Sequence, residues 1–306
     1  MELRDIEYFA VLARHGHLGR AAEALDLSTA AISKSLRRLE AAAGTKLVRR
    51  TPKGIDLTAV GRALLQHVRP VRLAHADMVR EVADLAGGRA GHIRLGTGPA
   101  TAETVLPDAC ARLMMEAPKV SLSTTISNND QMVPELRNGQ LDMIVHFAPQ
   151  FPVSGLVNET LWQDEHVVVA SEHHRLASHR RVALQELVEE RWSSTAAAAF
   201  LTWQSLLRKF EEAALPPPQI ALITESNALR LRTVAQTNLL AFLPKRAIEL
   251  APATLGLTIL PVKEVQYIQN VVLLYRKDGY LSPAALRFID ILKSIGPKSA
   301  EKTAPV

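Results

Sequence analysis

The chain has 306 residues, of which 47% are hydrophobic, with 36 Lys and Arg against 31 Asp and Glu. This length allows two or three domains with a sizeable core, and the composition excludes a mostly disordered chain. No stretch approaches the ~18 apolar residues of a membrane span, and the charged first residues are unlike a secretory signal. We therefore expect a cytoplasmic protein with no membrane partner.

The net charge of +5 is concentrated near the N-terminus. Residues 1–90 hold 15 basic and 10 acidic residues, whereas residues 91–306 are balanced. Between positions 28 and 53, Glu40 alone opposes seven basic side chains. Such a patch is typical of a surface that binds a polyanion, and also of a solvated charged face. The charge by itself does not choose between the two.

Short helices with tight connections are predicted for residues 1–44. One ends near residues 15–17, and a second covers roughly 18–25. Ser28 is a good N-cap for a third helix, which ends near Gly44, a residue suited to the left-handed conformation that terminates helices. Residues 46–58 then indicate a strand, a turn at 52–54 and a second strand.

The third helix has two different faces. Ile32, Leu36 and Leu39 form an apolar stripe, and the remaining surface is small, polar and basic. In a helix-turn-helix, small residues let such a helix approach base edges in the major groove, while longer basic side chains reach guanine or phosphate. The basic turn that follows would act as a wing on adjacent phosphates or the minor groove. The candidate DNA-binding residues are Ser28, Thr29, Ala30, Ser33, Lys34, Arg37, Arg38, Arg50 and Lys53.

A single long helix is predicted for residues 58–88. Positions from Leu57 to Leu85 are spaced alternately by four and three, as in a heptad seam with weak members at Gly61 and His75. We favour a dimerising helix over an ordinary core helix, because the apolar face is narrow. Pro70 predicts that this helix is bent or broken into two.

Strands and helices alternate from residue 92 onward. Strands are predicted over 92–97, 120–126 and 141–147, and helices over 107–117 and 131–138, which implies a parallel sheet. A second set has strands over 166–171, 219–224 and 238–244 and helices over 200–213 and 228–236, and a strand over 271–276 and a helix over 281–296 close it. The single cysteine, Cys110, excludes an internal disulfide and is expected to be a buried structural thiol.

Specific motifs lie along the chain: LGRAAEALDLSTAAISKSLRRLEAAAGTKLVRRTPKGIDLTAVG from Leu18, then LPDACARLMMEAPKVSL, LRNGQLDMIV, LVEERW and LSPAALRFIDIL. Over essentially the whole chain they resemble the LysR-type transcriptional regulators. The resemblance implies an α+β multi-domain protein with an N-terminal winged helix-turn-helix, a linker helix and a C-terminal two-lobed α/β effector domain like a periplasmic binding protein. It also implies a homotetramer that binds a double-stranded DNA operator and responds to a small molecule.

The expected domains follow these motifs. They are a DNA-binding domain over 1–58, a linker helix over 59–88 through which a homodimer forms, an effector domain over 89–300 and a tail over 301–306. Lobe I would take about 91–163 with 266–300, and lobe II about 164–265. The chain departs from the family at Thr29–Ala30, usually Gln-Pro, at Lys34, usually Arg, and at Thr237 and Leu239, normally glycines. The first two changes should alter base preference more than docking.

Candidate effector-binding residues lie where strands end, because ligands of such folds bind at the carboxyl ends of parallel strands. They coincide with positions that line the pocket in the family. A helix start, the Thr101 hydroxyl, Asn129 and a charged His146 would favour a small anion, so we expect a small organic acid as effector. The candidate set is Pro99, Ala100, Thr101, Asn128, Asn129, His146, Phe147, Phe200 and Asn227.

Other functions find less support in the residues. No nucleophile elbow, phosphate loop or paired cysteine is present, so we expect no enzyme, no catalytic residue and no cofactor. His173, His174 and His179 cluster in a polar stretch that we interpret as a solvated loop rather than a metal site. Two alternatives stay open: a small-molecule binding protein or enzyme built on the binding-protein fold, and a regulator with no ligand.

Overall fold

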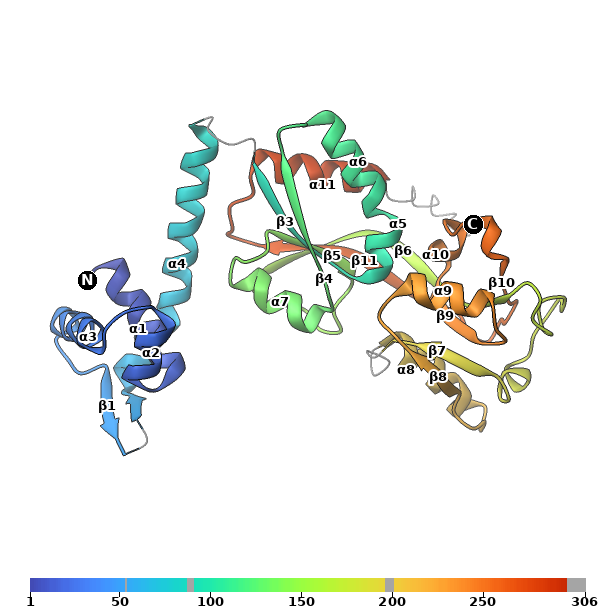
Figure 1. Ribbon diagram of the computed structural model, residues 1–306, viewed down its shortest axis with the longest axis horizontal. Helices are drawn as coiled ribbons and strands as arrows, with labels where there is room; N and C mark the ends of the chain where they lie inside the picture. The colour runs from blue at the N-terminus through green and yellow to red at the C-terminus, as the bar shows by residue number, and fades with distance from the viewer. Residues whose placement is uncertain (53, 87–90, 196–200, 296–306) are drawn as a thin grey trace, which may run out of the picture. The chain divides into compact units, whose positions relative to one another are not determined.

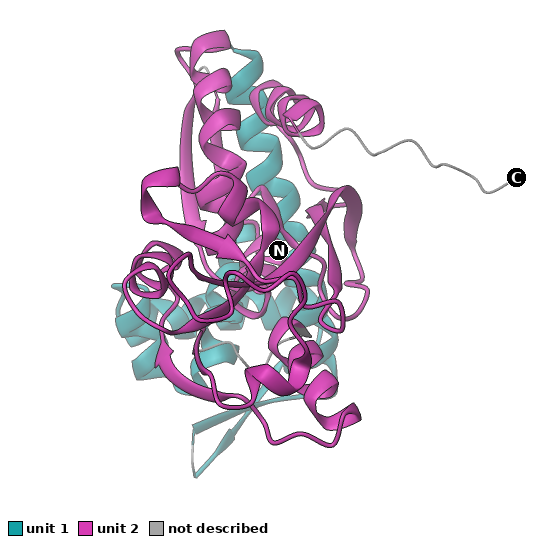
Figure 2. Ribbon diagram, turned by 90° about the vertical axis from the view of Figure 1, so that its right-hand side faces the viewer, with its two compact units in different colours: residues 1–86 teal, residues 87–306 magenta. Residues whose placement is uncertain are grey.

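The computed structural model describes residues 1–52, 54–86, 91–195 and 201–295. The chain divides into two compact units, Met1–Ala86 and Gly87–Val306 (Figure 2). Each unit has its own hydrophobic clusters, and each is described by itself below. Within the described residues, every helix is too short or too polar to cross a membrane.

The first unit contains four helices and a two-stranded hairpin among its described residues. Two apolar clusters hold it together, one around Phe9 and Leu39 and one around Leu12 and Ile32. The elements are α1 (Leu3–His15), α2 (Leu18–Ala24), α3 (Thr29–Ala43), β1 (Val48–Thr51), β2 (Gly54–Leu57) and α4 (Ala59–Leu85). This arrangement is a winged helix-turn-helix followed by a long helix, as the sequence predicts.

The bounds of α3 are set by local chemistry. The Ser28 hydroxyl accepts a hydrogen bond from the backbone N–H of Ala31 at 3.2 Å, which satisfies one of the free donors at the helix start. Gly44 ends the helix in the left-handed conformation, with φ of 67°. Both cap predictions are confirmed.

The heptad seam of α4 divides into two parts. Leu64 and Val68 pack on Phe9, Leu39 and Leu47, so they belong to the core of their own unit. The helix also lies so close to the hairpin that a Cβ on Gly61 would come within 2.0 Å of the Leu47 carbonyl oxygen. The later apolar positions are exposed; they are Val71, Met78, Val82 and Leu85. The interpretation of the whole seam as a dimer contact is therefore wrong for its first half.

Pro70 does not break α4. One helix runs through it from Ala59 to Leu85, so the alternative of two separate helices is wrong. A proline lacks the N–H that would bond to the carbonyl four residues earlier. In α4 this missing hydrogen bond lies near the point where the helix passes from the buried Val68 to the exposed Val71.

The second unit is built on one mixed sheet in the order β4-β3-β5-β11-β6-β9-β7-β8, with β10 pairing β6 (Figure 1). Its first half contains β3 (His92–Thr97), α5 (Pro99–Thr104), α6 (Leu106–Glu116), β4 (Ser121–Ile126), α7 (Asn129–Arg137), β5 (Met143–Phe147) and β6 (Leu156–Ser171). Its second half contains η1 (Leu184–Leu187), β7 (Arg191–Ser194), α8 (Leu201–Glu212), β8 (Gln219–Ile223), α9 (Asn227–Ala235), β9 (Leu240–Pro244), α10 (Lys245–Glu249), η3 (Ala253–Leu255), β10 (Leu257–Ile259), β11 (Tyr267–Arg276) and α11 (Pro283–Ile295).

The prediction of a parallel sheet is only partly right. Strands β4, β3 and β5 are parallel, as are β8, β7 and β9, but β5–β11, β11–β6 and β6–β9 are antiparallel. Two long strands cause the difference. β6 and β11 pair along most of their length, and each leaves one parallel set to join the other. The sequence pattern predicted only their shorter apolar ends, and it did not predict β7 or β10.

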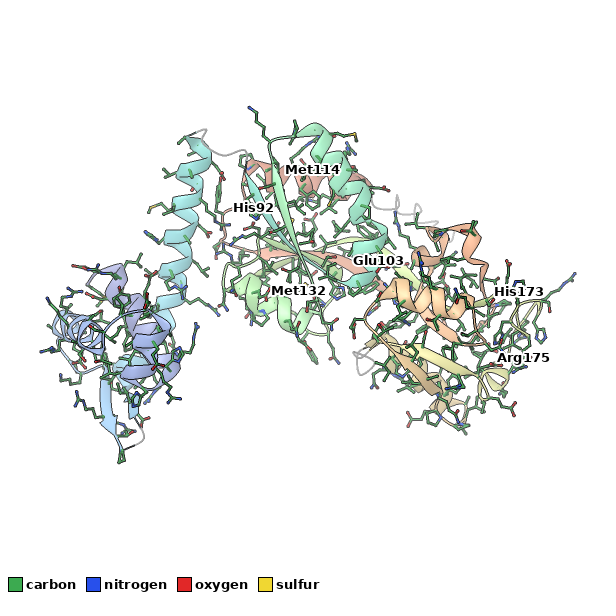
Figure 3. The ribbon with its side chains drawn as sticks, in the orientation of Figure 1. His92, Glu103, Met114, Met132, His173 and Arg175 are labelled. Carbon is green, nitrogen blue, oxygen red and sulfur yellow. The ribbon has the colours of Figure 1, made fainter. Side chains whose placement is uncertain are left out.

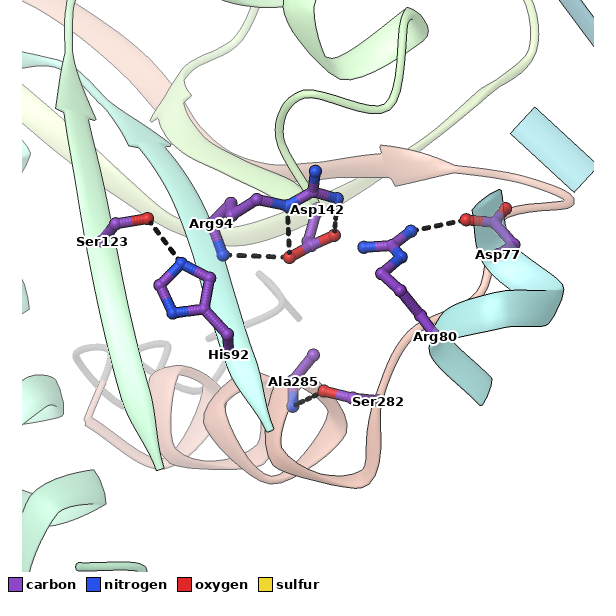
Figure 4. A network of polar contacts seen from close by, with 8 residues as sticks. All are labelled: Asp77, Arg80, His92, Arg94, Ser123, Asp142, Ser282 and Ala285. Atoms are coloured by element: carbon purple, nitrogen blue, oxygen red, sulfur yellow. Dashed lines mark hydrogen bonds and ion pairs between the residues drawn. The ribbon is translucent and has the colours of Figure 1, made fainter. Parts of the chain in front are cut away.

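Helices cover both faces of each half of the sheet. In the first half, α6 and α11 form one core with the strands and α7 forms another; in the second half, α8 lies over one core and α9 over the other. Asp142 anchors the end of β3 by accepting hydrogen bonds from the Arg94 backbone at 2.9 Å and from its guanidinium at 2.6 Å (Figure 4). Cys110 is half-buried against the first core, which is less than the predicted full burial, and this burial raises its thiol pKa.

Candidate nucleic-acid interface and effector cavity

The N-terminal half of α3 presents a small, polar surface with basic side chains. Ser28, Thr29, Ala30 and Lys34 are exposed, and Ser33 is half-buried. The backbone there is accessible because short side chains surround it, which is what close approach to base edges requires. The apolar stripe of the same helix is buried in the unit, so the polar face must point outward.

Arg38 is engaged inside its own unit. Its guanidinium donates to both carboxylate oxygens of Asp5 on α1, at 2.6 and 3.2 Å, and the Ser35 hydroxyl donates to the same carboxylate at 2.6 Å. Asp5 is 2% exposed. Burial opposes ionisation of Asp5, but the bonds from Arg38 and Ser35 outweigh it and hold the pKa of Asp5 below its usual value. Arg38 therefore ties α3 to α1 as well as contributing charge to the surface.

The wing is the hairpin β1–β2, whose register pairs Arg50 with Ile55. Arg50 is exposed, and the neighbouring Arg49 lies 3.4 Å from the carboxylate of Asp56. Lys53, predicted to contact DNA, lies outside the described residues. Arg37, on α3, is exposed and donates only a long bond of 3.4 Å to the Ser33 carbonyl oxygen.

A cavity of about 900 Å³ opens in the second unit where the parallel strands end. Both halves of the sheet contribute, since residues that follow β3, β4, β5 and β7 line it together with the first turns of α5, α7, α8 and α9. This is the position that the strand-end argument predicts. The predicted residues that line it are Pro99, Ala100, Asn128, Asn129, His146, Phe147 and Asn227.

Two predicted effector residues are not among those that line this cavity. Thr101 is 4% exposed and is absent from the cavity wall. It is the third residue of α5, on the side of that helix that packs into the protein, so its hydroxyl does not face a ligand. Phe200 lies outside the described residues.

His146 lies against Gly98, and its role differs from the prediction. A Cβ on Gly98 would come within 2.3 Å of the imidazole, so any other residue at this position would require the ring to shift. Burial lowers the pKa of His146 to about 4. The ring is therefore neutral at pH 7, and the expectation of a charged histidine donor is wrong. Its Nδ1 atom has no hydrogen-bond partner among the described residues.

Sequence reasoning missed Arg230, the one buried arginine among the described residues that line the cavity. Arg230 on α9 is 4% exposed, and its Nη2 atom donates to the carbonyl oxygens of Ser193 at 3.2 Å and Phe242 at 3.4 Å. Its Nε atom has no partner among the described residues. Burial lowers the pKa of Arg230 to about 10, so it stays charged at pH 7. A signal was present, because Arg230 stands on the buried stripe Asn227, Arg230, Leu231, Val234 with helical spacing.

Aromatic rings form a continuous row through this region. His166 on β6 has its ring centroid 5.2 Å from that of Phe147, 5.5 Å from Phe242 and 5.6 Å from Tyr267. Burial, and secondarily the charge of Arg230, lower the pKa of His166 to about 3, so this ring is also neutral. Phe147, His166, Phe242 and Trp203 all line the cavity.

A second cavity, of about 710 Å³, is lined by Glu103, Asp130 and Glu225, and of these Asp130 and Glu225 also line the larger cavity. The Glu103 carboxylate, on α5 (Figure 3), accepts a hydrogen bond from the backbone N–H of Ala228 in the first turn of α9. An acidic side chain thus already occupies that helix start. Arg230 lines the larger cavity and not this one, so an anion is better placed in the larger cavity, beside the guanidinium.

The histidine-rich loop after β6 is partly buried rather than solvated. His174 lies 3.2 Å from the carboxylate of Glu190, and the guanidinium of Arg175 (Figure 3) donates to the same carboxylate at 2.7 Å. His173 (Figure 3) is exposed. The loop is held by a structural ion pair, and no cluster of metal-ligating side chains was found in the parts of the chain described here.

A basic helix-turn-helix unit joined to a two-lobed unit with a cavity at its strand ends defines a DNA-binding protein with a ligand-binding domain. Two family models match it: "Bacterial regulatory helix-turn-helix protein, lysR family" over residues 3–62 and "LysR substrate binding domain" over residues 86–296. The chain belongs to the LysR family of DNA-binding transcriptional regulators, with an N-terminal helix-turn-helix domain and a C-terminal effector-binding domain.

Individual relatives agree with this assignment. The HTH-type transcriptional regulator AlsR of Bacillus subtilis is 26% identical over 99% of this chain and 99% of its own. Full-length CbnR, solved in complex with its target DNA, has a TM-score of 0.57 at 19% identity and covers 96% of this chain and 100% of its own. The regulatory domain of Synechocystis PCC6803 CcmR, solved with 2-PG, has a TM-score of 0.59 at 18% identity over 68% of this chain and 99% of its own.

Proposed function

We propose that the N-terminal half of α3 and the β1–β2 hairpin form the operator-binding surface. Exposure of Thr29, Ala30 and Lys34 beside a buried apolar stripe supports base contact by this helix. Exposure of Arg50 supports a phosphate or minor-groove contact by the wing. In this proposal Lys34 carries sequence preference, whereas Arg50 carries affinity that is independent of sequence.

Selection of genomic fragments by the full chain, followed by mobility shifts, tests this surface. We expect Arg50→Ala to weaken binding to specific and random DNA alike and to lower the salt slope by about one, because one phosphate contact is lost. Arg180→Ala, an exposed change in the second unit, serves as the matched control. If the Arg50→Ala variant kept the wild-type salt slope, the wing would not be part of the DNA interface.

We propose that the chain forms a homodimer through the exposed part of α4, from Val71 to Leu85, and that two dimers form a tetramer. The support is an exposed apolar row at heptad spacing on a helix whose earlier turns are already anchored in the unit. We also propose the domain bounds 1–58 for the DNA-binding domain, 59–88 for the linker helix and 89–300 for the effector domain.

We propose that the effector binds in the 900 Å³ cavity and is a small organic acid. The observation that carries this proposal is the buried, charged Arg230 among the residues that line the cavity. An anion compensates such a charge, and a cavity at strand ends between two halves is where a ligand can alter their arrangement. The cell sets the activity of the regulator by the concentration of this acid.

A paired assay tests the cavity as the sensing site. Asn129 donates from Nδ2 to the Phe147 carbonyl oxygen at 2.9 Å at the cavity wall. Asn129→Leu should abolish the transcriptional response to inducer in a reporter strain and leave the mobility shift intact. Asn138→Leu, an exposed change at the other end of α7, is the control. A normal response in Asn129→Leu would place the sensing site elsewhere.

A further inference from the structure

We propose that the effector is an aromatic carboxylate, with its acid group on Arg230 and its ring on the row formed by Phe147, His166 and Phe242. The inference rests on the proposed function, since it takes the larger cavity to be the effector site. It names Arg230 as the residue that selects an acid over its neutral analogue. It names the ring row as the feature that selects an aromatic acid over an aliphatic one.

The charge on Arg230 calls for an anionic partner. Its hydrogen bonds go to two neutral carbonyl oxygens. The Glu225 carboxylate lines the same cavity and its charge raises the pKa of Arg230, but among the described residues no carboxylate lies within salt-bridge distance of the guanidinium. A buried charge without an ionic partner is costly, and a carboxylate accepts two parallel hydrogen bonds from a guanidinium. The Nη1 atom makes no hydrogen bond to the described residues, so it can donate to such a ligand. Arg232, two residues along, is exposed and lacks this setting.

Among the described residues, no other buried cation lines this cavity. His166 belongs to the ring row and His146 lies beside Phe147. Burial keeps both imidazoles neutral at pH 7. Arg208 and Arg137 also line the cavity, from α8 and α7, but Arg137 reaches instead to the Ser154 carbonyl oxygen at 3.3 Å. Of these three arginines Arg230 is the buried one, and charge-assisted hydrogen bonds are strongest where water is excluded.

The ring row lies near Arg230, whose charge acts on the His166 ring. The Arg230 Nη2 atom donates to the backbone of Phe242, whose ring is 5.5 Å from His166, and His166 is 5.2 Å from Phe147. Aromatic pairs add an attraction beyond the area that they bury. A ligand with a ring attached to a carboxylate meets both features at once. An inorganic anion or a short aliphatic acid would meet only the first.

Titration of the full chain with matched probes tests the proposal, using calorimetry or the fluorescence of Trp203 at the cavity wall. The probes are benzoate, benzamide, cyclohexanecarboxylate, succinate and phosphate. We expect benzoate to bind at least tenfold more tightly than benzamide, and several-fold more tightly than cyclohexanecarboxylate and succinate. Phosphate should bind weakest. Binding should protect the second unit against thermal unfolding in the same order.

Three variants separate Arg230 from general stability. Arg230→Gln should remove the preference for benzoate over benzamide, Arg230→Lys should retain part of it, and Arg232→Gln should leave it unchanged. If Arg230→Gln does not fold, the wild-type probe order and the lysine variant still decide the outcome. Equal binding of benzoate and benzamide by the wild type would overturn the role of Arg230.

The results distinguish this inference from the proposed function. Tighter binding of succinate than benzoate, with loss in Arg230→Gln, would overturn the aromatic class and leave an organic acid as effector. Binding of benzoate with no dependence on Arg230 would overturn the assigned contact. Failure of every anion to bind, in protein that still shifts its operator, would overturn both the inference and the organic-acid effector, while the DNA-binding function would stand.

Discussion

Arg38 on α3 and Asp5 on α1 form an ion pair with a nitrogen–oxygen distance of 2.6 Å, and Asp5 is almost fully buried. Arg38, which the sequence pattern assigns to DNA, thus also links α3 to α1. Loss of a basic side chain at the proposed DNA-binding surface therefore acts in two ways, on a DNA contact and on the stability of the unit. Substitutions at Lys34 and at Arg38 allow the loss of a DNA contact to be separated from the loss of stability.

We expect Arg38→Ala to lower the urea midpoint of the first unit, because the buried Asp5 carboxylate loses its charged partner. DNA affinity should fall with it. Lys34→Ala should instead leave the midpoint unchanged and weaken specific binding by about 1–3 kcal/mol. Urea unfolding and mobility shifts on the same preparations measure both quantities. An Arg38→Ala variant with wild-type stability would show that the pair contributes nothing to the fold.

Local signals predicted the helix-turn-helix well because its caps and stripe are made by neighbours in sequence. Ser28 and Gly44 bound α3, and both are recognisable from residue type alone. The partner of Arg38 was not predictable, since Asp5 lies 33 positions away and only the packing of α1 on α3 brings it near. The helical stripe of α9 could have indicated that Arg230 is buried, but its hydrogen-bond partners were not predictable, because they come from β7 and β9.

The second unit also has features that the sequence predicts and features that only its packing reveals. Strand ends located the cavity and seven of its residues, because chain topology fixes where parallel strands end. Burial of individual side chains at those ends was not predictable. Thr101 turned inward, and His146 lost its charge to burial against Gly98. The long partners β6 and β11 escaped notice because only their apolar ends stand out in the sequence.

The division of the α4 seam predicts different results from two pairs of substitutions. Met78→Asp with Val82→Asp should yield a folded chain of lower mass in light scattering, because charge is placed on the exposed apolar row. Leu64→Asp with Val68→Asp should instead unfold the first unit, since both side chains are part of its core. Circular dichroism distinguishes the two. A folded oligomer of wild-type mass in the first pair would rule out this row as the dimer contact.

Gly98 should be intolerant of a side chain. Gly98→Ala places a methyl group within 2.3 Å of the His146 ring, so the imidazole at the cavity wall must shift. We expect an inducer affinity reduced at least tenfold with little change in operator binding, because overpacking costs about 1–3 kcal/mol. Gly155→Ala is not a fair control, since its φ is 78°, whereas Ala148→Gly opens space at the same wall without strain. Calorimetric titration with inducer and mobility shifts measure the two effects.

His166 should make the stability of the second unit dependent on pH. It is 2% exposed, and burial, aided by the charge of Arg230, lowers its pKa to about 3 from an ordinary value of 6.5. Between these values the unfolded chain binds a proton that the folded chain does not. The stabilisation is therefore fully present above pH 6.5 and is lost as the pH falls toward 3, by about 1.4 kcal/mol for each unit.

His166→Phe should remove this part of the pH dependence, because phenylalanine fits among the neighbouring rings of Phe147, Phe242 and Tyr267 and cannot be protonated. Urea unfolding of wild type and variant at pH 7.5, 6, 5 and 4 gives the difference in unfolding free energy. That difference should move in favour of the variant as the pH falls. His173→Phe, a change at an exposed ring that folding does not bury, is the control. Parallel curves for wild type and His166→Phe would mean that the His166 ring takes up its proton in the folded protein as readily as in the unfolded chain.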